Sequence, residues 1–173
     1  METLACIRGL SLPCLETLRI STDGLSKELW HGLHLAELPQ LRQLIINVDS
    51  TYLLGLIPIY GAQLKRLSLK EARMNVDTWR SIVRFCHALD VLCICSEAFE
   101  GGSYESGLQI GAEVWEMKTL IRLELRECSF DLVTFIRHHV RFPNLRSFAF
   151  TLIPDSTEPV YFTRFIAGMV RST

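Results

Sequence analysis

Two cysteines in the stretch "VLCIC" are separated by a single residue, a spacing at which thiols can act together. Side chains two residues apart in a β-strand lie on the same face, so Cys93 and Cys95 are expected side by side. Such a pair can bind a metal ion or react as a nucleophile once a thiol has ionised. This pair therefore supports one alternative prediction, a small hydrolase or redox enzyme that uses Cys93 and Cys95.

The histidines and a glycine-flanked serine are the other residues whose types suggest chemistry. His31 and His34 lie three apart on a predicted helix, and His138 and His139 are adjacent. A zinc site needs further Cys or His ligands at a compatible spacing, and none converge. Ser103 lies in "GGSYESG", which is not the G-x-S-x-G motif and has no base assigned to it. We therefore predict no catalytic residues, no metal site, no cofactor and no enzymatic activity.

A repeated sequence pattern extends over most of the chain. The pattern Leu-x-x-apolar-x-apolar occurs six times at intervals of 23 to 31 residues, with a charged second residue in five copies. Three copies share the lead-ins "LPCL", "LPQL" and "FPNL", so this is a repeat rather than a chance recurrence. The copies are "LETLRI" from Leu15, "LRQLII" from Leu41, "LKRLSL" from Leu64, "LDVLCI" from Leu89, "LIRLEL" from Leu120 and "LRSFAF" from Leu145.

The gap of three followed by a gap of two indicates a leucine-rich repeat. The last two apolar residues of each copy lie on one face of a short strand, and the first enters where the chain turns into that strand. One unit cannot bury its apolar side alone, so stacked copies form a continuous core. We predict an α/β leucine-rich repeat solenoid, with parallel short strands on the concave wall and helices on the convex side. Residues 1–173 would form one domain of about six irregular repeats, with strands near 17–20, 43–46, 66–69, 91–94, 122–125 and 147–150.

Helical spacing between the strands agrees with this architecture. Asp77 is the predicted N-cap of a helix with apolar residues at 79–86, and Asp131 precedes a second helix over 132–140. Residues 51–60 are too uniformly apolar, with a Gly and a Pro, to indicate a helix. The sequence also predicts two further helices and one loop, over residues 25–36, 162–170 and 97–107.

A doubly wound nucleotide-binding fold also alternates strands and helices. Its strands would be continuous apolar runs covered on both faces, whereas one face of each predicted strand is polar here. No G-x-G-x-x-G or G-x-x-x-x-G-K-[ST] motif occurs in the chain. The solenoid is therefore the better prediction.

The outward face of the predicted strands forms a wall whose charge differs from that of the whole chain. It carries five cations and one anion, a net +4, whereas the chain has a net charge of −1. Arginines bind carboxylates and phosphates in bidentate fashion, so we hypothesise that the wall binds an acidic or phosphorylated peptide segment. The alternative is a solvated face with a chance excess of cations. The predicted partner-binding residues are Arg19, Gln43, Arg66, Ser68, Lys70, Arg122, Glu124 and Arg126.

Composition excludes several classes of function. The net charge of −1 gives no overall attraction to nucleic acid or to an anionic membrane. The longest uncharged run, between Asp49 and Lys65, contains Pro58 and is too short for a membrane span. The N-terminus "METLACIRGL" does not read as a secretory signal, so the six cysteines are expected to be reduced. We predict an intracellular protein of the cytoplasm, the nucleus or both, without nucleic-acid or membrane partners.

Several phrases of the sequence resemble a known family. "LPCLETLRIS", "LKRLSLKEARM" and "FPNLRSFAF" are similar to the irregular leucine-rich repeats of F-box proteins, particularly the large fungal families, as is the helix-then-strand join "WRSIVRFCHALDVLCI". Cys128 in "LIRLELREC" matches the cysteine form of the repeat. The resemblance implies substrate selection for a ubiquitin ligase. The opening "LP-x-E-[LI]-L" of an F-box is not found, so the ligase scaffold is an expected partner only if the full-length product carries one.

The sequence therefore predicts a non-enzymatic module that recognises another protein, the substrate-binding part of an F-box ubiquitin ligase adaptor. The alternative with the same fold is the repeat region of an intracellular immune receptor of the plant type. A nucleotide-binding domain next to the repeats in the full gene would favour that alternative.

Overall fold

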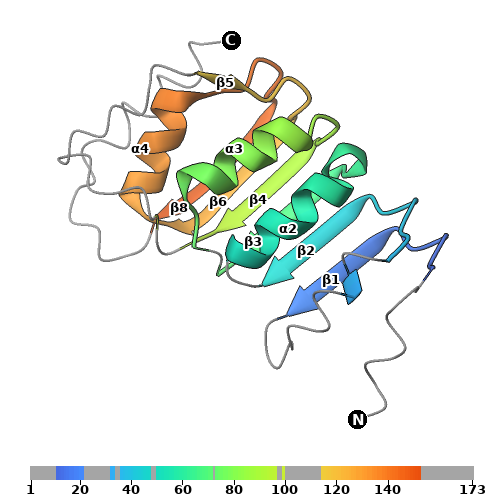
Figure 1. Cartoon of the computed structure of the whole chain (residues 1–173). Helices are drawn as coiled ribbons and strands as arrows, with labels where there is room; N and C mark the ends of the chain where they lie inside the picture. The colour runs from blue at the N-terminus through green and yellow to red at the C-terminus, as the bar shows by residue number, and fades with distance from the viewer. Residues whose placement is uncertain are drawn as a thin grey trace.

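A computed structural model of the chain describes residues 11–21, 32–33, 36–47, 50–71, 73–96, 99 and 114–152. Its main element is a six-stranded parallel sheet whose strands follow one another in chain order (Figure 1). The prediction of six parallel strands, one for each copy of the leucine pattern, is confirmed. The strands are β1 (Thr17–Ser21), β2 (Gln43–Asn47), β3 (Arg66–Lys70), β4 (Val91–Cys95), β6 (Arg122–Cys128) and β8 (Ser147–Leu152).

The six copies align with one another in the sheet. From β1 to β6 every strand pairs with the next in the same register, and β8 continues it as far as Phe150. On the helix side, the apolar side chains of the inner strands are buried, whereas on the outermost strands Ile20 is buried but Leu18, Phe148 and Phe150 are only half-buried. One apolar row runs through Leu18, Leu44, Leu67, Leu92, Leu123 and Phe148, and the next through Ile20, Ile46, Leu69, Ile94, Leu125 and Phe150.

Each strand is entered through the same turn. The amide of the first Leu of each copy donates to the carbonyl three residues earlier, at 3.1 to 3.4 Å. The carbonyl of the residue after that Leu then accepts two amides of the next copy, as Glu16 accepts from Arg42 and Gln43. This turn separates the first Leu from the strand and accounts for the gap of three. The six turn carbonyls belong to Leu12, Leu38, Gly61, Cys86, Met117 and Phe142.

Three α-helices lie on one side of the sheet: α2 (Ser50–Tyr60), α3 (Val76–Phe85) and α4 (Phe130–His139) (Figure 1). A short 3-10 helix, η1 (Gly61–Gln63), follows α2. The expectation that residues 51–60 do not form a helix is wrong. In that segment Leu53, Leu56 and Ile57 are fully buried at helical spacing, but the other side of the helix is apolar too and hides the period.

The helix caps differ from the prediction in position. Asn75, not Asp77, caps α3, because its side-chain oxygen accepts the amide of Thr78 at 2.8 Å. Asp77 lies in the first turn instead and pairs with Arg80 at 2.7 Å. Ser129 caps α4 through the amide of Leu132, so that helix begins one residue before Asp131.

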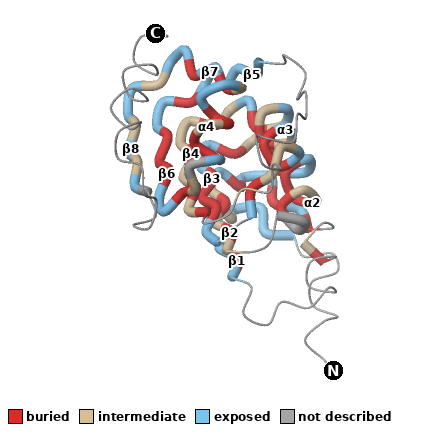
Figure 2. The backbone as a smooth tube through the Cα atoms, turned by 90° about the vertical axis from the view of Figure 1, so that its left-hand side faces the viewer, coloured by how far each residue is buried: buried red, intermediate tan, exposed pale blue. Residues whose placement is uncertain are grey.

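The core fills the space between the sheet and the helices (Figure 2). Aromatic rings concentrate at the α3–α4 end of it. The ring of Phe135 lies 5.0 Å from Phe99, 5.8 Å from Trp115 and 6.5 Å from Trp79, measured between ring centroids. Trp79 and Phe135 are fully buried, so the helices are anchored on the sheet by large apolar contacts.

A second, smaller ladder joins the lead-ins of the repeats. Strand β5 (Trp115–Glu116) pairs in parallel with β7 (Val140–Arg141), and Ser11 forms an equivalent bridge with Glu37. Met117 extends the pairing of β5 with β7 by donating its amide to the Arg141 carbonyl at 3.0 Å. These bonds fix the lead-in turns next to one another, which keeps the strands that follow in register.

Some predicted segments lie outside the described residues. These are the helix over 162–170, the loop over 97–107 apart from Phe99, and most of the helix over 25–36. Within the described part of the chain, no helix combines the length and apolar character needed to cross a membrane.

Candidate functional site

The predicted wall residues lie in three rows on the sheet face opposite the helices, because they alternate with the buried residues of each strand. Between β6 and β8 a register shift after Leu125 pairs Cys128 with Leu152, so Thr151 lies opposite two residues of β6, Arg126 and Glu127. The first row is Thr17, Gln43, Arg66, Val91, Arg122 and Ser147; the second is Arg19, Ile45, Ser68, Cys93, Glu124 and Ala149; the third is Ser21, Asn47, Lys70, Cys95 and Arg126.

Strand β6 carries a carboxylate held between two arginines. Glu124 Oε1 lies 2.6 Å from Arg122 Nε, and its Oε2 lies 2.7 Å from Arg126 Nη2. The Glu124 side chain is only 3% exposed, whereas those of Arg122 and Arg126 are 52% and 61% exposed. The two guanidinium groups therefore cover the carboxylate and direct their remaining N–H donors to solvent.

The protonation of Glu124 follows from this arrangement. Burial alone would raise its pKa, but hydrogen bonds and the positive charges of Arg126 and Arg122 outweigh burial and lower the pKa from the usual value of a glutamate. The same contacts raise the pKa of Arg126. Glu124 is thus ionised at neutral pH and offsets one of the two positive charges of its strand.

Strand β3 presents a similar pair of cations without an acid between them. Arg66 and Lys70 are exposed, and neither forms an ion pair with another described residue. Ser68 lies between them and is 8% exposed. These two cations are therefore accessible to an anionic ligand.

Strand β4 forms a strip without charge between the two cation pairs. It presents the half-buried side chains of Val91, Cys93 and Cys95. The Cys93 thiol donates to Glu124 Oε2 at 3.8 Å, and the Cys95 thiol donates to Glu127 Oε2 at 3.5 Å. The strip therefore connects to the acids of β6 through hydrogen bonds rather than through charge.

Both thiols of the strip are held in the protonated form. Burial raises the pKa of Cys93 most, and Glu124 raises it further. Burial and Glu127 likewise raise the pKa of Cys95. A thiol reacts and binds metal as its thiolate, so this environment disfavours the use of Cys93 and Cys95 as nucleophiles at neutral pH. Both are free, as are the described Cys14, Cys86 and Cys128.

Of the two remaining predicted binding residues, Arg19 is separated from the β3–β6 region and Gln43 adjoins it. Arg19 is exposed on the outermost strand β1, and the half-buried Ile45 of β2 lies beside it in the same row. Gln43 is half-buried in the first row, directly beside Arg66. The structure therefore brings Gln43, Arg66 and their neighbours together but leaves Arg19 at the edge.

The described histidines do not form a common site. His139 is half-buried and stacks on Phe135 with 4.9 Å between ring centroids, whereas His138 is exposed. Desolvation and the nearby charges of Arg137, His139 and Arg141 lower the pKa of His138. Among the described residues, no three His, Cys, Asp or Glu side chains converge as metal ligands would. His31, His34 and Ser103 lie outside the described residues.

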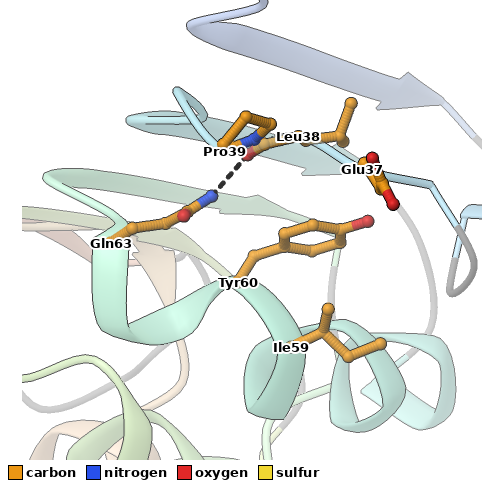
Figure 3. A pocket seen from close by; sticks show the side chains of 6 residues that line it. All are labelled: Glu37, Leu38, Pro39, Ile59, Tyr60 and Gln63. Carbon is orange, nitrogen blue, oxygen red and sulfur yellow. Dashed lines mark hydrogen bonds between the residues drawn. The ribbon is translucent and has the colours of Figure 1, made fainter. Parts of the chain in front are cut away.

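An open hollow of about 310 Å³ lies where α2 and η1 meet the lead-in of β2 (Figure 3). It was not predicted, because its residues come from two repeats. Tyr60 donates its hydroxyl to the carbonyls of Leu33 and Ala36, and Gln63 donates to that of Leu38 at 2.7 Å. These polar groups join the two repeats and leave the hollow without a group arranged for chemistry. Its lining residues are Glu37, Leu38, Pro39, Ile59, Tyr60 and Gln63.

Two glutamates at one end of the wall have left-handed backbone conformations, with φ of 54° at Glu71 and 50° at Glu127. Each follows the third-row cation of its strand, Lys70 or Arg126. Non-glycine residues rarely adopt this conformation, and nothing in a Glu signals it from sequence. At Glu127 the amide donates to Thr151 Oγ1 at 3.1 Å, which joins the irregular part of β6 to β8.

Comparison with known proteins adds no neighbour. No family model, no curated protein and no solved structure matches this chain.

Proposed function

We propose that this chain is a leucine-rich repeat solenoid that recognises another protein and has no enzymatic activity of its own. The support for the solenoid is the recurrence of one turn, one parallel strand and one shared carbonyl in successive copies. The helices occupy one side of the sheet and leave the polar wall on the other (Figure 1). Walls of this kind serve as extended binding surfaces in repeat proteins.

The partner that fits the wall best is an acidic or phosphorylated segment of a protein. The observation that carries this proposal is the alignment of Arg66 and Lys70 with Arg122 and Arg126 on either side of an uncharged strip. These four cations and Glu124 sum to +3, and two further acids, Glu71 and Glu127, lie at one end of the wall. Arginine forms charge-assisted, often bidentate hydrogen bonds with carboxylates and phosphates, which are the strongest polar contacts available at an open surface.

The resemblance to F-box proteins gives this recognition a cellular role. We propose that the chain selects substrates for a ubiquitin ligase inside the cell, through an F-box carried by the full-length product. This part is tested on the full gene product, which should bind the ligase scaffold through its F-box while the repeats bind the substrate. A full-length product without an F-box, or one with a nucleotide-binding domain, would replace this role with another.

Charge reversal on the wall tests the binding surface. The probe is a pool of short random-sequence peptides with a central phosphoserine, and binding to immobilised protein is compared with that of the dephosphorylated pool. The variant Arg66→Glu, Arg122→Glu, Arg126→Glu should lose binding by more than about tenfold, because three contacts become repulsive. The control variant Arg84→Glu, Arg137→Glu, Arg141→Glu changes the net charge equally at residues outside the wall and should keep it. Unchanged affinity in the wall variant would refute the proposal.

A further inference from the structure

The two cation pairs of the wall lie on strands β3 and β6, which are separated by the single strand β4. Arg66 shares a row with Arg122 across Val91, and Lys70 shares a row with Arg126 across Cys95. Neighbouring strands lie about 4.8 Å apart, so the backbones that carry the two pairs are separated by about 10 Å. A ligand that contacts both pairs must therefore place two anionic groups about that far apart.

The two pairs differ in strength as anion sites. Arg66 and Lys70 of the β3 pair form no ion pair with another described residue. In the β6 pair, Glu124 already occupies one donor of Arg122 and one of Arg126. With Glu124 counted, the β6 pair sums to +1 and the β3 pair to +2, and one further acid follows each pair, Glu127 after Arg126 and Glu71 after Lys70. A phosphate carries about −1.5 to −2 at pH 7 and has three acceptor oxygens, so it gains more than a carboxylate from the β3 pair.

The conformation of the ligand follows from the same separation. In a β-strand, residues on one face are two or four apart, about 7 or 13 Å, and neither distance matches. In a polyproline II helix, residues three apart lie on the same side and about 9 Å from each other. That conformation has no internal hydrogen bonds and is common in unfolded chains, so a disordered segment can adopt it at little cost.

We infer that the wall reads two anionic residues three positions apart in a polyproline II segment that crosses the strands. The segment places a phosphorylated residue over Arg66 and Lys70 and a second anionic residue over Arg122 and Arg126. The uncharged strip of Val91, Cys93 and Cys95 lies under the two residues between them. This inference rests on the proposed function and specifies the partner of the same site.

A spacing series tests the inference. Fluorescent peptides carry one phosphoserine and one glutamate in a Gly/Ser background, separated by every interval from adjacent to six apart, and their affinities are measured by fluorescence anisotropy at low ionic strength. The affinity should peak at an interval of three, about fivefold above adjacent placement, because only that spacing engages both cation pairs. Two prolines between the anionic residues should raise the affinity further by fixing the bound conformation.

Two variants identify the source of the peak. Arg66→Gln with Lys70→Gln removes one cation pair, so binding should weaken by about tenfold and the dependence on spacing should vanish. Arg84→Gln with Arg137→Gln removes the same charge from residues outside the wall and should retain the peak. A flat profile, or a peak at another interval, with binding that still depends on the wall overturns this inference alone. Failure of the wild-type protein to bind any of the phosphopeptides overturns the proposed function as well.

Discussion

Strands β3 and β6 carry the sequences "RLSLK" and "RLELR" in the same register of one sheet, with β4 between them. Both bury two leucines towards the helices and expose two cations on the wall. They differ at the central wall position, which is Ser68 in β3 and Glu124 in β6. Because side chains two apart on a strand are neighbours, that one residue decides whether the flanking cations are paired or open. The core of the repeat and the chemistry of its surface are therefore set by alternate residues of the same strand.

The largest expected effect concerns what the two strands share. Leu67→Ala and Leu123→Ala each empty a fully buried position of the same apolar row, so each should lower the free energy of unfolding by about 2 to 5 kcal/mol. Chemical denaturation measures both values. A loss below about 1 kcal/mol in either variant would contradict equivalent burial of the two strands.

The second prediction concerns the carboxylate that only β6 has. Glu124→Gln should lower the free energy of unfolding by about 1 kcal/mol at pH 7. It removes the negative charge and one of the two acceptor oxygens that pair with the half-exposed arginines. The folded-state pKa of Glu124 is lowered relative to the unfolded state, so its ionised form stabilises the fold above the unfolded-state pKa. This contribution disappears as the pH falls through the folded-state pKa.

Denaturation of wild type and Glu124→Gln at a series of pH values checks this. The difference between them should shrink as the pH falls from the unfolded-state pKa of Glu124 through its lower folded-state pKa. Glu116→Gln removes a carboxylate whose ion pair with Lys118 is open to water, and it should change stability by less than about 0.5 kcal/mol. A difference between wild type and Glu124→Gln that stays constant down to acid pH would show that the carboxylate is not ionised in the clamp.

The third prediction transfers the acid from β6 to β3. Ser68→Glu should pair with Arg66 and Lys70 as Glu124 pairs with its arginines, and it should lower the affinity for the phosphoserine peptides by about fivefold. Ser68→Gln fills the same volume without charge and should leave the affinity nearly unchanged. Equal effects of the two substitutions would mean that volume, and not charge, controls access to the cations.

The strands could be predicted from sequence because one spacing recurs six times, and the register follows since identical turns start every strand. The pairing of Glu124 with Arg122 and Arg126 could also have been predicted, because three alternating residues of one strand share a face. Summing the charges of the whole wall does not show which of them are paired. Helix α2 was missed because apolar residues on both sides obscure its period. The register shift between β6 and β8 had no sequence signal, because it depends on the backbone of Glu127.

The smallest expected effect distinguishes the two thiols of β4. Glu124→Gln removes an acid that raises the pKa of Cys93 and leaves the charge of Arg126, which lowers it. Alkylation of Cys93 by iodoacetamide at mildly alkaline pH should therefore accelerate by about threefold, measured peptide by peptide with mass spectrometry. Cys95 donates to Glu127 instead and should react at an unchanged rate, while the buried Cys128, with a pKa of about 12, should stay protected in both proteins. Faster alkylation of all three thiols would indicate general opening of the sheet, and an unchanged rate at Cys93 would mean that Glu124 does not control the thiol between the two cation pairs.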